Sequence, residues 1–204
     1  MRAGLHLVSN PKKICVLLWR SKREKLSFQY NSWPLGNLPE NWRRQEPYLL
    51  RDAGYVWDDP RDINLIFESK LADYAGAKFA ILTDCCTNGL YLSLQYRLLE
   101  KKLRGGQDIS LPVQSYVSVP MIILQSGMNP VFVEEKWSGM YQLGESGIWD
   151  SAARFTEMMY VGGDALQVLS FQIKKRLPIG RGGVILTDDS SAYAWLKRAV
   201  YDGR

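Results

Sequence analysis

The sequence predicts an α/β protein in which helices flank a mostly parallel sheet. From residue 59 onward, short apolar runs alternate with stretches of helical periodicity, and this alternation is typical of βαβ units with parallel strands. The 204-residue chain is 46% hydrophobic, which is enough to bury one sizeable core. We therefore expect a basic tail and an irregular leading segment over residues 1–58, followed by one domain over residues 59–204.

Each expected element follows from its local pattern. Proline and glycine are frequent between residues 27 and 58, which favours an extended, irregular segment. Asp59 and Pro60 are suited to begin a helix, whose apolar residues recur at helical spacing until Gly76. The rest of the chain predicts, in order, a strand at 78–83, a helix at 87–103, a strand at 109–112, a helix at 117–126, strands at 130–134 and 147–150, strands at 165–171 and 183–187 joined by a basic turn, and a helix after Asp189.

Charge and composition exclude several classes of protein. The net charge is +5, and residues 1–25 hold seven cationic residues against one acidic residue, so the remainder is nearly neutral. A basic tail can bind nucleic acid, but the neutral body argues against that function and favours a solvated extension. The apolar run 14–19 is shorter than the ~20 residues of a membrane helix and precedes no signal-peptide cleavage site. Three cysteines that cannot all pair fit a cytoplasmic location, and the single histidine, His6, excludes histidine-based catalysis in the body.

Polar residues follow four strand ends, which is where ligands of open α/β sheets bind. Residues 83–89 join a strand to the start of a helix, whose free amides favour a phosphate; the other interpretation is that Thr87 caps its own helix. Tyr116 follows the next strand and could stack on a planar cofactor or pack against the protein. Asp150 ends a short strand and could hold a positive ring nitrogen or cap a following helix.

The fourth strand end runs into a turn rich in cations and glycines, residues 169–183. One interpretation is a solvated basic loop. The other is a reactive lysine, because the positive charges around Lys175 favour the neutral amine that forms a Schiff base with a carbonyl group. The glycines would let the backbone pass close to a ligand.

Taken in this order, the motifs resemble those of the DegT/DnrJ/StrS family of sugar aminotransferases, which depend on pyridoxal 5'-phosphate (PLP). The resemblance extends from about residue 59 to residue 204. Several segments carry it. Residues 68–80 resemble the stretch that leads into the family's first cofactor-binding turn, Cys86-Thr87-Asn88-Gly89-Leu90 resembles its Gly-Thr-Ala-Ala-Leu phosphate turn, and Ser115-Tyr116-Val117 stands where the family places the aromatic residue that stacks on the pyridine ring. Residues 127–133 resemble its Gly-Ala-x-Pro-Val-Phe-Val strand, Trp149-Asp150-Ser151-Ala152-Ala153 resembles its Glu-Asp-Ala-Ala-Gln, and residues 170–175 resemble its Ser-Phe-His-x-x-Lys, followed by a Gly-x-Gly-Gly ending at residues 180–183.

The resemblance implies the large domain of a fold type I PLP-dependent transferase, with the small domain missing from this chain. It makes Lys175 the catalytic Schiff-base lysine. The other cofactor-binding residues that it implies are Cys86, Thr87, Tyr116, Asp150, Ser170 and Gln172. The implied reaction transfers an amino group from an amino acid, typically glutamate, to a keto group of a nucleotide-linked sugar, and the implied assembly is a homodimer. Related family members with histidine in place of the lysine are dehydratases, so Lys175 favours the transferase.

Several features depart from the family pattern. Residues 134–147 are too few for the additional strand-and-helix unit that the family usually has there, so the usual sheet is not expected intact. Cys85 and Cys86 replace a Ser-Gly pair, Ala153 replaces a glutamine that contacts the phenolic oxygen of PLP, and Gln172 replaces a frequent histidine. Together with the missing small domain, these departures leave one alternative function, a catalytically inactive PLP-fold fragment that serves as a binding or assembly subunit.

Overall fold

The computed structural model describes residues 45–57 and 62–201. They belong to two units, of which the first ends at Ile63 and the second begins at Asn64. In the first unit, helix α2 (Glu46–Asp52) has a proline in its first turn, and the Arg51 guanidinium lies 4.8 Å from the centre of the Trp57 ring. The expectation of an irregular segment is wrong for this stretch, because proline fits a first helical turn, where its missing N–H costs no hydrogen bond. The basic tail and the expected helix start at Asp59 and Pro60 lie outside the described residues.

The remaining elements follow the order expected from the sequence. They are α3 (Asp62–Ala75), β1 (Phe79–Thr83), α4 (Cys86–Leu99), β2 (Asp108–Pro112), α5 (Ser118–Gln125), β3 (Asn129–Val133), β4 (Tyr141–Gln142), β5 (Ile148–Asp150), β6 (Leu166–Ser170), β7 (Gly183–Thr187) and α6 (Ser190–Ala199). Helix α4 ends at Leu99, short of the expected residue 103, and Lys101 beyond it has a left-handed φ of 61°. Strand β4 was not expected.

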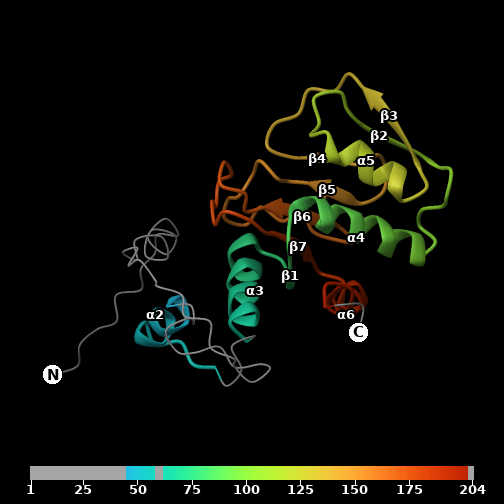
Figure 1. Ribbon diagram of the computed structural model, residues 1–204. Coiled ribbons are helices and arrows are strands. Elements are labelled where there is room, and N and C mark those ends of the chain that lie inside the picture. Colours follow the sequence, from blue (N-terminus) through green and yellow to red (C-terminus); the bar gives the residue numbers. More distant parts are fainter. Residues whose placement is uncertain (1–44, 58–61, 202–204) are drawn as a thin grey trace, which may run out of the picture. The chain divides into compact units, whose positions relative to one another are not determined.

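The sheet is mixed, so the prediction of a mostly parallel sheet is wrong. Five strands pair in the order β1-β7-β6-β5-β4, and of these only β5 and β6 run parallel to each other. Strands β2 and β3 form a separate parallel pair (Figure 1). Parallel neighbours need a long crossover connection, whereas antiparallel neighbours can follow directly. Strand β7 follows β6 through a turn, and β5 follows β4 in the same way, so both pairs are antiparallel.

The separation of the two sheets coincides with the shortened segment, residues 134–147. Instead of a strand-and-helix unit, this segment contributes the two-residue strand β4, which pairs with β5 so that Tyr141 lies opposite Asp150. The Gly144 amide then donates a hydrogen bond to the Ser110 carbonyl of β2 at 2.9 Å. This bond links the two sheets.

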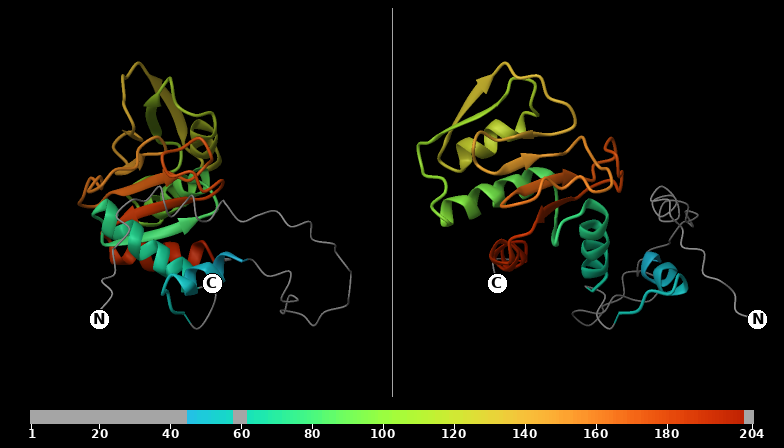
Figure 2. Two further views of the ribbon diagram at one scale, coloured as in Figure 1. Left: turned by 90° about the vertical axis from the view of Figure 1, so that its left-hand side faces the viewer. Right: turned by 180° about the vertical axis from the view of Figure 1, so that it is seen from behind.

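Helices cover both faces of the five-stranded sheet (Figures 1 and 2). Helix α3 buries its apolar residues against Leu169 and Leu186, whereas α4, α5 and α6 pack around Val168 and Ile185. These neighbouring strand residues face opposite sides because side chains alternate along a strand. The sheet thus has one core on each face.

The edge strand β1 is closed by a charged pair. The buried Glu68 carboxylate of α3 accepts a hydrogen bond from the Leu82 amide of β1 at 2.8 Å. It also forms an ion pair with Lys197 of α6 at 2.8 Å. A capped edge amide is no longer free to pair with another strand.

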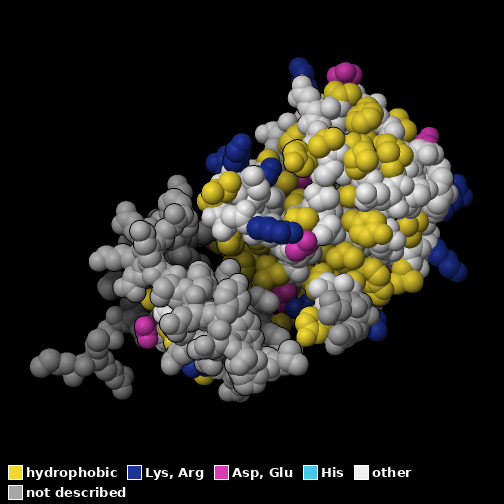
Figure 3. All heavy atoms as spheres, viewed as in Figure 1, with side chains coloured by type: hydrophobic (Ala, Val, Ile, Leu, Met, Phe, Trp, Pro, Cys, Tyr) yellow, Lys and Arg dark blue, Asp and Glu magenta, His cyan; other side chains and the backbone are white. Residues whose placement is uncertain are grey.

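Large apolar side chains remain exposed on α5 and β3, namely Met121, Leu124, Val131 and Phe132. Figure 3 shows hydrophobic side chains gathered over the part of the molecule that carries these elements. Within the described residues, none of the helices is both long and apolar enough to cross a membrane.

Candidate cofactor site

The first polar strand end is the start of helix α4. Cys85, rather than Thr87, caps this helix, because its Sγ accepts the Asn88 amide at 3.4 Å. The Thr87 hydroxyl instead makes a hydrogen bond of 2.8 Å with the Ser118 hydroxyl of α5. The start of β7 lies directly against the helix start, since a Cβ added to Gly183 would lie 2.7 Å from the Cys86 nitrogen. The first-turn amides of α4, which favour an anion, therefore lie beside the turn that contains Lys175.

Asp150 is a buried carboxylate with two protein donors. It is 6% exposed, and it accepts hydrogen bonds from the Tyr141 hydroxyl at 2.8 Å and from the Ala152 amide at 2.9 Å. Burial raises the pKa of Asp150, while the Ala152 amide, the Tyr141 hydroxyl and the charge of Lys175 act in the opposite direction. Strand β6 is the next element after β5, so Asp150 does not cap a helix.

Lys175 differs from its cationic neighbours in the turn after β6. Its side chain is half-buried, whereas Lys174 and Arg176 are exposed, which argues against a uniformly solvated loop. The charge of Lys175 lowers the pKa of the buried Asp150 and of the partly buried Cys86 thiol. For Cys86, burial is the largest effect and raises the pKa, and the charge of Asp150 raises it further. The structure therefore brings Cys86, Asp150 and Lys175 within electrostatic reach of one another.

Three other residues predicted for the site hold more peripheral positions. Gln172 is exposed, and its Oε1 accepts the Lys174 amide at 2.8 Å, so its side chain is engaged in its own turn. Ser170 ends β6, where its hydroxyl accepts the Gln172 amide at 3.4 Å. Tyr116 is 72% exposed. The ring of Tyr116 is thus free to cover a ligand and contributes little to the core.

Sequence reasoning missed two polar residues that contact the predicted ones, Tyr141 and Ser118. Tyr141 lies in the shortened segment, where a two-residue strand gives too little alternation to be recognised. A signal was nevertheless present, because Gly144 and Gly147 fall between the pairing residues, and a short glycine-containing loop is typical of a hairpin. Ser118 gave no comparable signal.

An open cavity of about 660 Å³ lies around the β1 edge, next to the first and fourth strand ends. Its lining includes Phe67, Asp84, Asn88 and Arg181, and Arg181 forms a 3.5 Å ion pair with Asp84. Lys175 and Asp150 do not line it. The size of this cavity therefore does not identify the candidate site, which rests on the chemistry of the strand ends.

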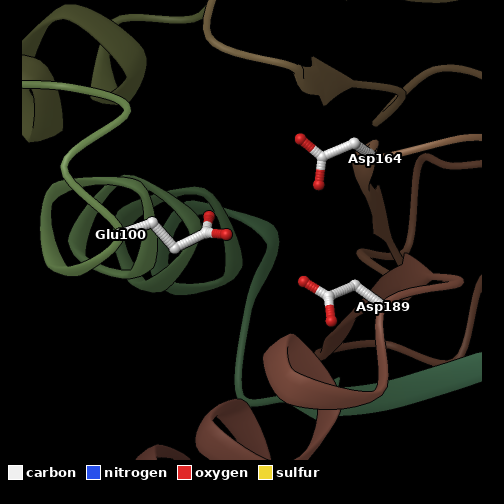
Figure 4. A group of neighbouring side chains, drawn as sticks. All are labelled: Glu100, Asp164 and Asp189. Atoms are coloured by element: carbon white, nitrogen blue, oxygen red, sulfur yellow. The ribbon is translucent and has the colours of Figure 1, made fainter.

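A second polar cluster lies at the opposite end of β5 and β6. Glu100, Asp164 and Asp189 point toward one another (Figure 4), with carboxylate oxygens within 4.8 Å. The cations Arg97 and Lys102 each bind both Glu100 and Asp164, at distances from 2.7 to 3.3 Å. Protein cations thus neutralise Glu100 and Asp164, while Asp189 accepts hydrogen bonds from the Tyr96 hydroxyl and the Ser191 amide, so we interpret the cluster as a structural ion network.

Comparison with solved structures shows which fold the chain has. The chain matches DesV from S. venezuelae, solved with a ketimine intermediate, with a TM-score of 0.58 and 17% identity, covering 77% of this chain and 52% of DesV. Helicobacter pylori PseC, an aminotransferase of pseudoaminic acid biosynthesis, matches with a TM-score of 0.54 and 20% identity, covering 76% of this chain and 52% of PseC. DesI, solved in the presence of its TDP-sugar product, matches with a TM-score of 0.54 and 17% identity. The match covers 78% of this chain and 49% of DesI. The fold is that of PLP-dependent aminotransferases, and the chain spans about half the length of these structures.

A family model also matches part of the sequence. Residues 57–141 match the model of the DegT/DnrJ/EryC1/StrS aminotransferase family, the family that the sequence motifs resemble. None of the curated proteins compared with the chain matches it.

Proposed function

We propose that the chain carries the PLP site of an aminotransferase that moves an amino group from an amino acid, such as glutamate, to a keto group of a nucleotide-linked sugar. The observation that carries the proposal is that Lys175, Asp150 and Cys86 at the α4 start lie within electrostatic reach of one another. In support, PseC is an aminotransferase of pseudoaminic acid biosynthesis, DesV was solved with a ketimine intermediate, and DesI was solved in the presence of its TDP-sugar product. The family resemblance also supports a homodimer.

The donor set of the site fits PLP. Each oxygen of Asp150 accepts one protein hydrogen bond, and a carboxylate has about four acceptor positions, so capacity remains for a protonated ring nitrogen. The amides at the start of α4 suit a phosphate. Lys175 is close enough to Asp150 and Cys86 to influence both electrostatically, as an amine at a shared ligand site would be.

Each residue would have a distinct task. When bound, PLP supplies an electron sink for reactions at the carbon next to an amino group. Asp150 would hold the positive ring nitrogen, and the Thr87 and Ser170 hydroxyls with the Cys86 and Thr87 amides would bind the phosphate. Lys175 Nζ would anchor the cofactor and then carry a proton from the substrate carbon to the adjacent cofactor carbon.

The test is an absorbance spectrum of the purified chain with added PLP, before and after borohydride reduction. We expect a lysine-linked band in the wild type that is lost in Lys175→Ala and retained in Lys174→Ala, because Lys174 is the exposed neighbour. Release of 2-oxoglutarate after addition of glutamate would then show amino transfer. If the wild type forms no band, the inactive binding or assembly subunit becomes the better hypothesis.

A further inference from the structure

Tyr141 is the nearest polar partner of Asp150 that the family motifs do not account for. Its hydroxyl donates to Asp150 Oδ2 at 2.8 Å, and both side chains are buried, with 4% and 6% exposure. It lies in the shortened segment, residues 134–147, to which the sequence motifs assign no role in the site.

The geometry holds the hydroxyl in place from two directions. Tyr141 lies directly opposite Asp150 in the β4–β5 pair, and its ring packs against Trp137 with a centroid distance of 4.9 Å. The Ala152 amide binds the other carboxylate oxygen at 2.9 Å. Two fixed donors, one on each oxygen, leave the Asp150 carboxyl group little freedom to rotate.

The direction of the hydrogen bond follows from the environment of the two groups. Burial raises the pKa of Tyr141, and the charge of Asp150 raises it further, so the phenol keeps its proton and acts as the donor. Its hydrogen bond in turn favours the ionised form of Asp150 against the effect of burial. An ionised, fixed carboxylate is the form that binds a protonated ring nitrogen.

We infer that Tyr141 is a positioning residue that orients the Asp150 carboxylate toward the ring nitrogen of PLP. This inference rests on the proposed function, because it assigns a role within the same site. Tyr141 acts through Asp150 and is not itself assigned a contact with the reacting atoms.

The experiment compares PLP with its 1-deaza analogue, in which the ring nitrogen is replaced by carbon. In Tyr141→Phe, we expect PLP to bind about tenfold more weakly, as the loss of a hydrogen bond to a charged group predicts. The deaza analogue should bind the wild type and the variant equally. The ¹⁵N shift of labelled PLP should also move toward the unprotonated form in Tyr141→Phe.

Two controls make the result specific. Tyr160→Phe removes another hydrogen-bonded phenol, which donates to the Ala165 carbonyl at 3.0 Å, and should leave the affinity ratio of PLP to deaza-PLP unchanged. In an Asp150→Asn background, Tyr141→Phe should have no further effect on PLP affinity, and the unfolding midpoint checks that each variant folds.

Equal loss of both ligands in Tyr141→Phe would assign the residue a purely structural role and overturn the inference. Unchanged PLP affinity with an unchanged ¹⁵N shift would overturn it as well, while leaving the proposed function intact. A wild type that binds no PLP would overturn both.

Discussion

Acidic and basic residues gather at both ends of strands β5 and β6, but the candidate cofactor site lies at one end and a structural ion network at the other. At the carboxyl end, Asp150 retains acceptor capacity after its two hydrogen bonds, and Lys175 acts on it through space. At the amino end, Asp164 is bound by Arg97 and Lys102. Helix α4 joins the two, because its first turn lies at one end and Arg97 at the other. Charges that are fully paired hold elements together, whereas charges with spare capacity are available to a ligand.

Arg97 gives the strongest test of the structural role of the ion network at the amino end of β6. Its side chain is 1% exposed and binds Glu100, Asp164 and the Asp164 carbonyl, and its guanidinium lies close to Gly147, where a Cβ would be 3.1 Å away. Replacement in Arg97→Met should destabilise the fold by about 3 kcal/mol, because the Glu100 carboxylate and the Asp164 carbonyl each lose the hydrogen bond from this buried side chain. Urea unfolding measures the change.

The exposed Arg104 provides the control for this prediction. Arg104→Met should change the free energy of unfolding by less than about 0.5 kcal/mol. If Arg97→Met were equally mild, the ion network would not be a structural clamp, and the contrast between the two ends would fail.

Gly183 tests how closely the candidate site depends on backbone packing. A Cβ there would lie 2.7 Å from the Cys86 nitrogen and 2.8 Å from the Leu169 carbonyl oxygen, and backbone atoms cannot yield as side chains can. Gly183→Ala should cost about 2 kcal/mol, in the range of overpacked cores, and should weaken PLP binding by displacing the start of α4. Gly105→Ala, whose added Cβ has its nearest neighbour at 3.9 Å, should change neither the unfolding energy nor PLP binding.

The pH dependence of stability should show the smallest effect. Burial raises the pKa of Asp150 above its ordinary value of 3.8, so the folded chain holds this proton to higher pH than the unfolded chain. The contribution of Asp150 to stability therefore falls as pH rises from about 3.8 through the folded pKa. Asp150→Asn should become progressively more stable relative to the wild type across this range, as followed by urea unfolding at several pH values. A constant difference between the two proteins would contradict this assignment.

Most elements were predictable because their signals are local. Strand β7 has the predicted bounds, and α3, β1 and α5 fall within one or two residues of the predicted ends inside the described part of the chain. Strand direction was not predictable in the same way, because β1 and β7 are distant in sequence and pair only in the folded sheet. The hairpin containing Tyr141 was missed because its strand is too short to show a period.

For the candidate site, too, some features follow from the sequence and others only from the tertiary structure. The sequence by itself determined which residue types stand at each strand end and in which order, and these sufficed to recognise the family resemblance. Only the tertiary structure decided that Lys175 is half-buried while Lys174 is exposed, that Cys85 caps α4 instead of Thr87, and that Tyr141 binds Asp150. The physical reason is that burial and hydrogen-bond partners depend on which strands become neighbours, which local periodicity does not encode.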